Sequence, residues 1–558
     1  MSVLASLSLS VLLHAAPATS PVADAAKARD AAAVRALLKQ GGDVNGAQGD
    51  GMTALHWAAM QGDAELAGML LYAGANWRAT TRLGGYTPLH LASQSGAAPV
   101  VRTLLDGGAD ADARTSTGAT ALMLAAKAGS VDAVTGLLDK GADTNATESA
   151  YGQTALMIAA ALDRADVTRV LLERGADPRI ASKFTDLAAL TAPADPDRQP
   201  QGGGAGARPA AAAEGGERRP DVPGVTRPFR YNELIGAQGG LTALHMAARQ
   251  GSALALRALV EGGADVNQAS PGDRTTPLLI ATVNGHFDIA SYLLDKGADP
   301  NLASAAGATP LYGVVNVQWA PKAAYPQPRA HLQQTSSYLD LMKALLEKGA
   351  DPNARVRRKV WFASYNFDQS SVDEVGATAF WRAAYASDVA AMKLLVGYGA
   401  DPNIPTMKAA GRSRPADGDP VMRDVSTAPP MPVGGPSVTP LQAAAGVGYG
   451  QGFAGNSHHV APAGMMAAVT YLVDDLGADV NASDGDGNTA LHHAASRGDN
   501  EMILFLVSKG ADVTTVNRAG QSTVDLANGP VQRIQPFPET IALLEKLGAK
   551  NHHKCVSC

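Results

Sequence analysis

Apolar and polar residues follow a unit of about 33 residues along this chain, and each unit holds two short amphipathic segments. In the unit that begins at Thr87, apolar residues at helical spacing occupy residues 89–92 and again residues 100–105. Gly96 and Gly108 follow the two segments, and glycine commonly ends a helix. The pattern therefore predicts pairs of short helices. One pair alone cannot bury its apolar stripe, so each pair needs neighbours of the same kind.

The motif Thr87-Pro-Leu-His at the start of this unit returns along most of the chain in related forms such as Thr53-Ala-Leu-His. Such regular recurrence is the signature of a stacked repeat array. Threonine is a favourable residue before a helix, and proline at the first helical position loses no hydrogen bond. Each unit also closes with a Gly-Ala-Asp type of turn, as at residues 108–110 and 510–512. Ser20 takes the place of the threonine in the first unit, and the other units begin at Thr53, Thr87, Thr120, Thr154, Thr242, Thr276, Thr309, Thr378, Thr439, Thr489 and Thr523.

These motifs resemble the ankyrin repeat, and the resemblance covers nearly all of the chain after residue 20. It implies an all-α fold, an α-solenoid of about twelve helix-turn-helix repeats with projecting β-hairpin loops. It also implies a scaffold that binds a partner protein through the hairpin tips and the concave helix face. The chain contains no phosphate-binding loop, nucleophile elbow, His-Glu-x-x-His motif or dinucleotide fingerprint, so we expect no enzyme.

By this resemblance, the partner-binding positions include the helix residues that follow the Ala-Ala pair of each first helix. The sequence does not name the partner, and we expect the protein to be a monomer. The expected contact residues are Met60, Gln61, Gln94, Lys127, Arg249, Gln250, Asn284 and Tyr385.

Histidines recur in the Thr-x-Leu-His phrase, at His56, His90, His245 and His492. A metal role is disfavoured because each histidine belongs to a separate unit. Other units carry Met123, Met157, Leu279 or Tyr312 at the same position. We therefore predict a structural role, in which the imidazole hydrogen-bonds the backbone at the base of a hairpin.

The repeats form two blocks, residues 19–182 and 239–548. Residues 183–238 between them are rich in Pro, Gly and Ala and lack apolar periodicity, which predicts an insertion or linker. The second block carries further insertions at residues 318–334, 354–375, 404–436 and 446–460.

The 354–375 insertion is the most distinctive candidate site outside the repeats. Basic and aromatic residues gather in it, and such residues are enriched at interface hot spots. An alternative is that its rings fold back on the helices as a satellite core, and a nucleic-acid site is a third reading. The candidate partner-binding residues are Arg357, Arg358, Trp361, Phe362, Tyr365 and Phe367.

Composition narrows the choice of partner. The formal net charge of −6 argues against nucleic acid or an anionic membrane as partner. Aromatic residues make up 5% of the chain, which suits an Ala- and Leu-rich interior of thin helical layers. No segment has the length and apolarity of a transmembrane helix, so we expect no stable membrane insertion.

Residues 1–18 differ from the repeats. An apolar run over residues 3–13 precedes Ala16-Pro-Ala18, which resembles a signal peptide and its cleavage site, although no Lys or Arg precedes the run. Export to a bacterial periplasm is the expectation. The alternatives are a buried N-terminal helix and a cytoplasmic scaffold with a misread start.

The tail at 549–558 ends in Cys555-Val-Ser-Cys558. Cys-x-x-Cys-His attaches c-type haem, and the sequence stops one residue before such a histidine. One reading is a truncated fusion in which the repeats carry a haem or electron-transfer domain. The others are a disulfide or metal site in the tail, and a free tail. We expect no cofactor, and haem c only under the truncation reading.

Overall fold

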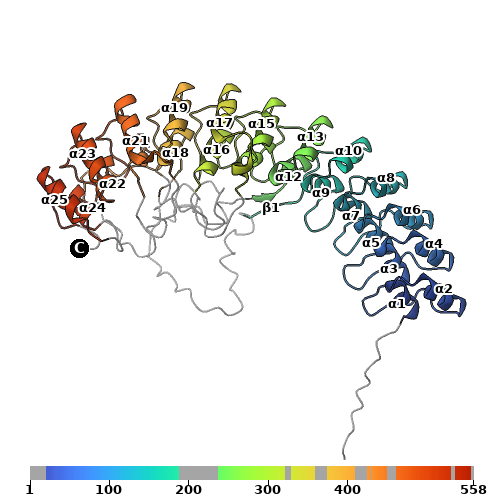
Figure 1. Cartoon of the computed structure of the whole chain (residues 1–558). Helices are drawn as coiled ribbons and strands as arrows, with labels where there is room; N and C mark the ends of the chain where they lie inside the picture. The colour runs from blue at the N-terminus through green and yellow to red at the C-terminus, as the bar shows by residue number, and fades with distance from the viewer. Residues whose placement is uncertain are drawn as a thin grey trace, which may run out of the picture. The chain divides into compact units, whose positions relative to one another are not determined.

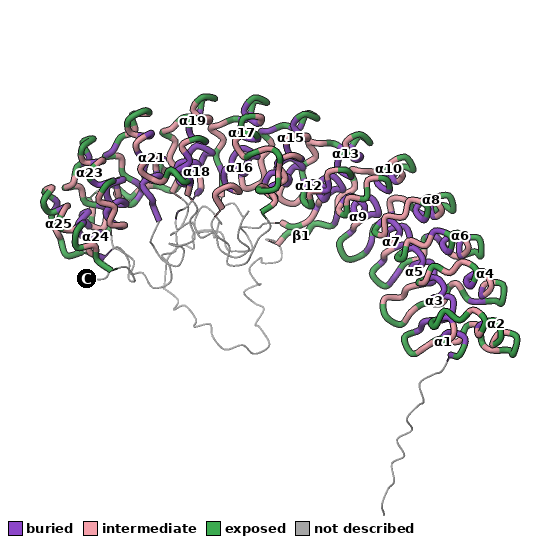
Figure 2. Tube along the Cα trace, viewed as in Figure 1, coloured by how far each residue is buried: buried purple, intermediate pink, exposed green. Residues whose placement is uncertain are grey.

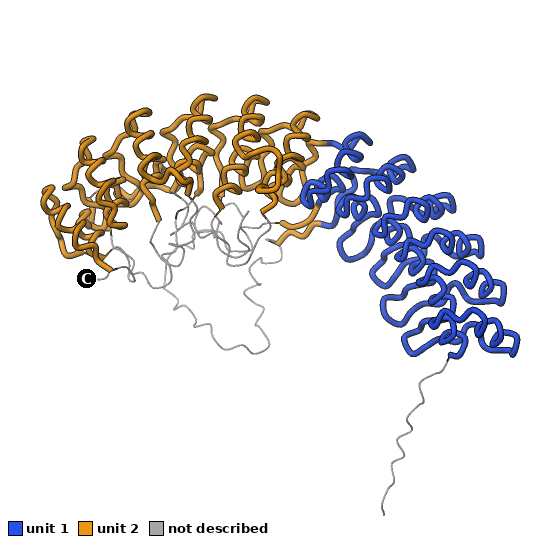
Figure 3. The backbone as a smooth tube through the Cα atoms, in the orientation of Figure 1, with its two compact units in different colours: residues 1–183, 241–265 blue, residues 184–240, 266–558 orange. Residues whose placement is uncertain are grey.

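The structure is a computed structural model that describes residues 20–187, 237–320, 329–358, 372, 374–408, 424–427, 429–448, 460–529 and 535–554 (Figure 1). Its described part contains twelve consecutive pairs of short helices. The chain forms two compact units (Figure 3). Unit 1 comprises residues 1–183 and 241–265, and unit 2 comprises residues 184–240 and 266–558. The predicted all-α solenoid of about twelve repeats is confirmed.

In unit 1, the first helices of successive pairs pack in one row and the second helices pack in another. The first helices are α1 (Pro21–Lys27), α3 (Ala54–Gln61), α5 (Pro88–Gln94), α7 (Ala121–Ala128), α9 (Ala155–Ala161) and α12 (Ala243–Gln250). The second helices are α2 (Ala31–Lys39), α4 (Ala64–Tyr72), α6 (Ala98–Asp106), α8 (Val131–Asp139), α10 (Ala165–Glu173) and α13 (Ala253–Glu261).

Unit 2 contains six more pairs, and their first helices again pack in one row. Its first helices are α14 (Pro277–Val283), α16 (Pro310–Gln318), α18 (Ala379–Tyr385), α20 (Pro440–Ala444), α22 (Ala490–Ala495) and α24 (Thr523–Asn528). Its second helices are α15 (Phe287–Asp295), α17 (Tyr338–Glu347), α19 (Val389–Gly397), α21 (Gly464–Thr470), α23 (Asn500–Ser508) and α25 (Pro538–Lys546). A 3-10 helix covers Ala330–Gln333.

The threonine phrase builds each first helix as expected. Thr53 accepts a hydrogen bond from the His56 amide at the N-terminus of α3, and Ser20 does the same for Ala23 at α1. The last unit departs by one residue, because Ser522 caps α24 and Thr523 is its first helical residue. Figure 2 shows that the first helices of unit 1 have buried stretches. In five of them the leucine two positions after the N-cap is at most 1% exposed, namely Leu55, Leu89, Leu122, Leu156 and Leu244.

The long insertion after α10 does not separate the two repeats that flank it, since α9 packs on α12 and α10 packs on α13 inside unit 1. The N-cap Ser252 makes no side-chain bond to α13. Instead, Asp163 Oδ1 accepts the Ala255 amide at 2.8 Å, so the preceding repeat caps the helix. Ser252 Oγ also donates to the Ala161 carbonyl at 3.2 Å. The stack is thus continuous at this point.

The projecting hairpins consist mostly of turns. In the described part of the chain, the one two-stranded sheet pairs β1 (Phe184–Asp186) antiparallel with β2 (Ala237–Gly239). Single bridges, such as that between Arg114 and Thr120, mark other hairpins.

One repeat contains an extra residue before its Gly-Ala-Asp turn, and a π-helical turn absorbs it. Helix α21 continues into Tyr471–Asp475, where the Leu476 amide donates to the Tyr471 carbonyl at 3.2 Å. The wider turn restores the register of the repeat, because the Ala478 amide then donates to the Leu472 carbonyl at 2.9 Å.

Asparagine side chains join the outer turns of successive repeats. Asn301 Nδ2 donates to the Gly349 carbonyl at 2.8 Å, and Asn301 Oδ1 accepts the Asp351 amide at 2.7 Å. The same pair of bonds ties one turn to the next at Asn45, Asn145, Asn267, Asn353 and Asn481. Each asparagine satisfies backbone groups at a helix end that its own repeat cannot reach.

We expect Asn301→Ala to lower the free energy of unfolding of unit 2 by about 2 kcal/mol, because two hydrogen bonds between repeats are lost. Urea denaturation followed by circular dichroism measures the change. Asn403→Ala is the matched control, since Asn403 holds the same place in its turn but its side chain has no hydrogen-bond partner among the described residues. If Asn403→Ala lowers the free energy of unfolding as much as Asn301→Ala does, the hydrogen bonds between repeats are not the cause of the loss.

Candidate protein-interaction surface

The first helices of unit 1 present a row of apolar side chains that their neighbours only partly cover. Four positions after the N-caps of α3, α5, α7 and α9 lie Trp57, Leu91, Leu124 and Ile158, all half-buried, whereas α1 has the exposed Asp24 and α12 the buried Met246 at this position. Because α3, α5, α7 and α9 pack in sequence order, these side chains follow one another across the unit. A partly exposed apolar row on a rigid surface is typical of a docking face.

Polar and basic side chains flank this row. Three positions further along the same helices, Met60 is 42% exposed, and Gln94 and Lys127 are exposed. Gln61 is half-buried, and its amide Nε2 donates to the Lys27 carbonyl of the preceding repeat at 3.0 Å.

Basic groups lie at both ends of the first-helix row. The Lys27 ammonium lies 5.0 Å from the centre of the Trp57 ring, a cation–π distance. Arg249 and Gln250 are exposed at the end of α12. The surface therefore combines apolar area with positive charge.

Two hairpins of unit 1 carry large apolar side chains at their tips. Leu83 is 84% exposed and Tyr151 is 70% exposed. A left-handed glycine makes such a tip possible, as at Gly84, whose φ is 80°. Sequence reasoning missed Leu83, Tyr151 and the Trp57 row. The residues of the row all lie four positions after the N-cap threonine, and this constant spacing could have revealed the row in the sequence.

His56 and His90 act as predicted. His56 Nδ1 accepts the Thr53 amide at 3.1 Å, so the proton lies on Nε2, which faces the Tyr86 carbonyl at 3.1 Å. His90 makes the equivalent contact with the Ala113 carbonyl at 2.9 Å. Burial lowers the pKa of both imidazoles, although hydrogen bonds to backbone carbonyls oppose the shift. Each imidazole therefore joins a first helix to a hairpin base.

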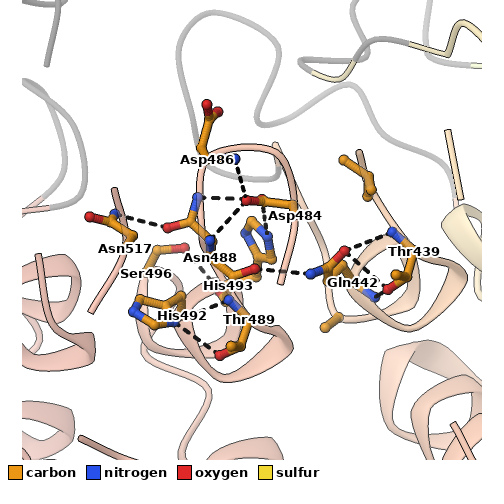
Figure 4. Close-up of polar contacts among 12 residues, drawn as sticks. Thr439, Gln442, Asp484, Asp486, Asn488, Thr489, His492, His493, Ser496 and Asn517 are labelled. Carbon is orange, nitrogen blue, oxygen red and sulfur yellow. Dashed lines mark hydrogen bonds and ion pairs between the residues drawn. The ribbon is translucent and has the colours of Figure 1, made fainter. Parts of the chain in front are cut away.

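Other polar residues replace histidine at this position and still reach a hairpin. Gln442 accepts the Thr439 amide at 2.7 Å through Oε1, and its Nε2 donates to the Ala482 and Asn488 carbonyls at 3.0 and 2.9 Å (Figure 4). Trp381 Nε1 likewise donates to the Val438 carbonyl at 3.0 Å. The position thus connects repeats wherever a histidine, glutamine or tryptophan side chain provides the hydrogen bond.

Near Gln442, a second histidine pairs with a buried carboxylate. His493 Nε2 lies 3.3 Å from Asp484 Oδ2, and both side chains are at most 7% exposed (Figure 4). Burial alone would raise the pKa of Asp484. The hydrogen bond and charge of His493 and the amides of Asn488 and Asp486 outweigh it and lower the pKa. These contacts hold the 478–488 hairpin against α22.

In unit 2, the expected contact residues fall into different environments. Asn284 and Arg357 are exposed, and Arg358 is half-buried. The expectation that Tyr385 lies on the surface is wrong: it is 3% exposed and stacks on Trp381 with ring centres 5.3 Å apart. Both rings belong to an apolar cluster that the repeat pattern did not reveal, because insertion residues complete it. The cluster contains Ala308, Tyr312, Val356, Val372, Ala377, Trp381, Tyr385, Val438, Ala443 and Val447.

Several predicted residues lie outside the described part of the chain. They are Trp361, Phe362, Tyr365 and Phe367 of the insertion, and Cys555 and Cys558 of the tail. Residues 1–18 also lie outside it. Export, haem attachment and a partner site at these rings therefore stay predictions.

Within the described ranges, no cluster of three or more His, Cys, Asp or Glu side chains has the arrangement of a metal site. A search of the same residues finds no helix with the length and hydropathy needed to cross a bilayer.

Stacked helix pairs, projecting hairpins and a partly exposed apolar face define a repeat protein of the protein-binding class. Family models for ankyrin repeats match residues 22–115, 89–182, 229–304 and 457–507, which together make up about half of the chain. The chain belongs to the ankyrin repeat family.

Curated relatives match over short stretches. The chain is 42% identical over 74 residues to protein phosphatase 1 regulatory subunit 12A of Mus musculus, which is 13% of this chain and 7% of that protein. It is 44% identical over 73 residues to mouse protein phosphatase 1 regulatory subunit 27, which is 13% of this chain and 46% of that protein. An ankyrin repeat protein of Rickettsia bellii is 35% identical over 71 residues, 12% of this chain and 39% of that protein. The chain thus spans less than two thirds of each of them.

Acid should weaken the C-terminal repeats through His492. Burial, and then the nearby His493, lower the pKa of His492 from 6.5 to about 4, although Asp484 and backbone carbonyls oppose the shift. A folded-state pKa below the unfolded value means that the unfolded chain binds the proton first. The contribution of His492 to the free energy of unfolding is therefore fully present above pH 6.5. We expect it to be lost as the pH falls toward 4, which lowers the free energy of unfolding by at most about 3 kcal/mol.

Urea denaturation at several pH values between 4 and 7.5 measures this loss. His492→Gln should reduce the pH dependence, because Gln442 shows that glutamine fits the same position. An unchanged pH slope in the variant would show that other groups cause the acid sensitivity.

Proposed function

We propose that the protein is a non-catalytic scaffold that binds a partner protein on the first-helix face of unit 1. The observation that supports this most is the half-buried apolar row of Trp57, Leu91, Leu124 and Ile158. Stacking holds these side chains in place before binding, so little conformational entropy is lost when a partner docks. We propose that the protein acts as a monomer.

The chemistry of the face supports a partner segment that carries apolar side chains and carboxylates. The apolar row would receive the apolar side chains. Lys27, Lys127 and Arg249 flank the row and would attract the carboxylates, which favours the orientation of the partner and the rate of encounter.

The relatives support the same class of function. Two of them are named as regulatory subunits of protein phosphatase 1, so their names describe proteins that work in complex with another protein. Because only short stretches match, we carry over the binding of a protein and not the identity of that protein.

The double variant Met60→Glu, Lys127→Glu tests the proposal. Both side chains are exposed, so the change should alter the face without disturbing the core. We expect at least a tenfold weaker Kd for a partner recovered by crosslinking and then purified, as measured by calorimetry. The reason is that a carboxylate replaces an apolar contact and reverses a favourable charge.

Tyr72→Glu, Arg102→Glu is the matched control. It changes one exposed apolar and one exposed basic residue in the same way, but on α4 and α6 of the second-helix row. The control should bind like the unmodified protein. If the control weakens binding as much as the test variant, or if neither does, the partner does not use the first-helix face.

A further inference from the structure

A segment of the 404–436 insertion lies on a hairpin that follows it by about ninety residues in the chain. The insertion extends the hairpin after α19, while Arg518 belongs to the hairpin between α23 and α24. Two helix pairs, α20 with α21 and α22 with α23, intervene along the chain. The contact therefore joins parts of unit 2 that the repeat period would keep apart.

Arg518 makes most of this contact. Its guanidinium Nη1 lies 3.2 Å from Asp424 Oδ2 and 3.5 Å from Ser426 Oγ, and Nη2 donates to the Pro429 carbonyl at 3.0 Å. The Arg518 carbonyl accepts the Val425 amide at 2.9 Å. The guanidinium and carbonyl groups of one residue thus contact a carboxylate, a hydroxyl and two backbone groups of the segment.

The hairpin tip is shaped for close approach of another chain segment. Gly520 has a φ of 75°, and a Cβ at this position would lie 3.0 Å from Val425 Cγ2 and 2.7 Å from Lys554 Nζ. A side chain larger than hydrogen would therefore crowd the Val425 side chain of the segment.

Neighbouring hairpins hold Arg518 in position. Its amide donates to the Asp486 carbonyl at 2.9 Å, in the preceding hairpin. Burial and the nearby Asp484 raise the pKa of Asp486, while the positive charges of Lys408 and Arg518 oppose the shift. The Arg518 site is thus backed by two successive repeats, which keeps its donors in a fixed arrangement.

The base of the insertion is pinned separately. Met407 and Pro436 form an antiparallel bridge, and the Lys408 amide donates to the Gly435 carbonyl at 2.8 Å. Residues 424–427 and 429 lie a few residues before Gly435 in the chain, so this pinned base tethers them. Tethering a segment near its site raises its local concentration to the order of millimolar. At that local concentration, a contact made by one arginine is enough to keep the segment bound.

We propose that the Arg518 hairpin tip is a recognition site for an Asp-x-Ser segment, and that residues 424–427 and 429 occupy this site in cis. A partner segment of the same chemistry binds there by displacing the chain's own segment. The site lies in unit 2 and does not depend on the first-helix face of unit 1.

A labelled synthetic peptide of residues 421–432 tests the proposal by fluorescence anisotropy against the full chain. The peptide should bind the unmodified protein weakly, because the tethered copy competes. Asp424→Ala, Ser426→Ala in the protein removes two contacts of the tethered copy, so the apparent affinity for the peptide should rise at least tenfold. Adding Arg518→Ala to that variant should abolish binding.

A peptide with both the aspartate and the serine replaced by alanine should not bind any form of the protein. Arg174→Ala is the matched control, because Arg174 also forms a surface ion pair, at 2.7 Å from Asp139, but in unit 1. If the opened variant binds no peptide at 1 mM, or binds it equally with Arg518→Ala, the recognition site does not exist.

Hydrogen exchange gives a second readout that needs no added peptide. The Val425 amide is bonded to Arg518 in the full chain, so exchange at residues 424–427 should be slowed. Arg518→Ala should restore fast exchange there, and Arg174→Ala should not. Fast exchange at these residues in the unmodified protein would overturn occupation of the site in cis.

Discussion

Each repeat of this protein depends on hydrogen bonds that only its neighbour can supply. Short helices leave several backbone groups unpaired at each end, and these helices have seven to ten residues in most cases. Asn301 and its equivalents satisfy such groups of the next outer turn, and His56 or Gln442 satisfies carbonyl groups at the next hairpin base. The requirement that neighbours complete one another sets the stacking distance and direction, and the buried leucine row follows from it.

This constraint explains which parts of the chain can vary. Insertions enter at hairpins and between paired helices, where they leave the connecting residues in place. The clearest case is the insertion after α10, because Asp163 caps α13 across it. The chain can therefore add long segments without losing the stack. Those segments can then take on contacts of their own, as residues 424–427 and 429 do at Arg518.

The same constraint leaves one face of the first helices free. Residues that hold neighbours together point into the stack or toward the hairpin bases. Trp57 and the equivalent residues remain half-buried on the open face. Residues after the Ala-Ala pair were predicted correctly to be exposed at Met60, Gln94 and Lys127, because those helices carry no covering insertion. The same rule failed at Tyr385, since Val356 and Val372 of an insertion join the cluster around it.

The sequence by itself determined the repeat number, the helix pairs, the N-caps of all first helices but the last, the buried leucines and the structural role of His56 and His90. Each of these is periodic, and a periodic requirement appears in every unit. Only the tertiary structure decided the capping of α13 by Asp163, the burial of Tyr385 and the contact of Arg518 with residues 424–427 and 429. Those contacts join residues that are far apart in the chain and occur once, so no local pattern or period in the sequence encodes them.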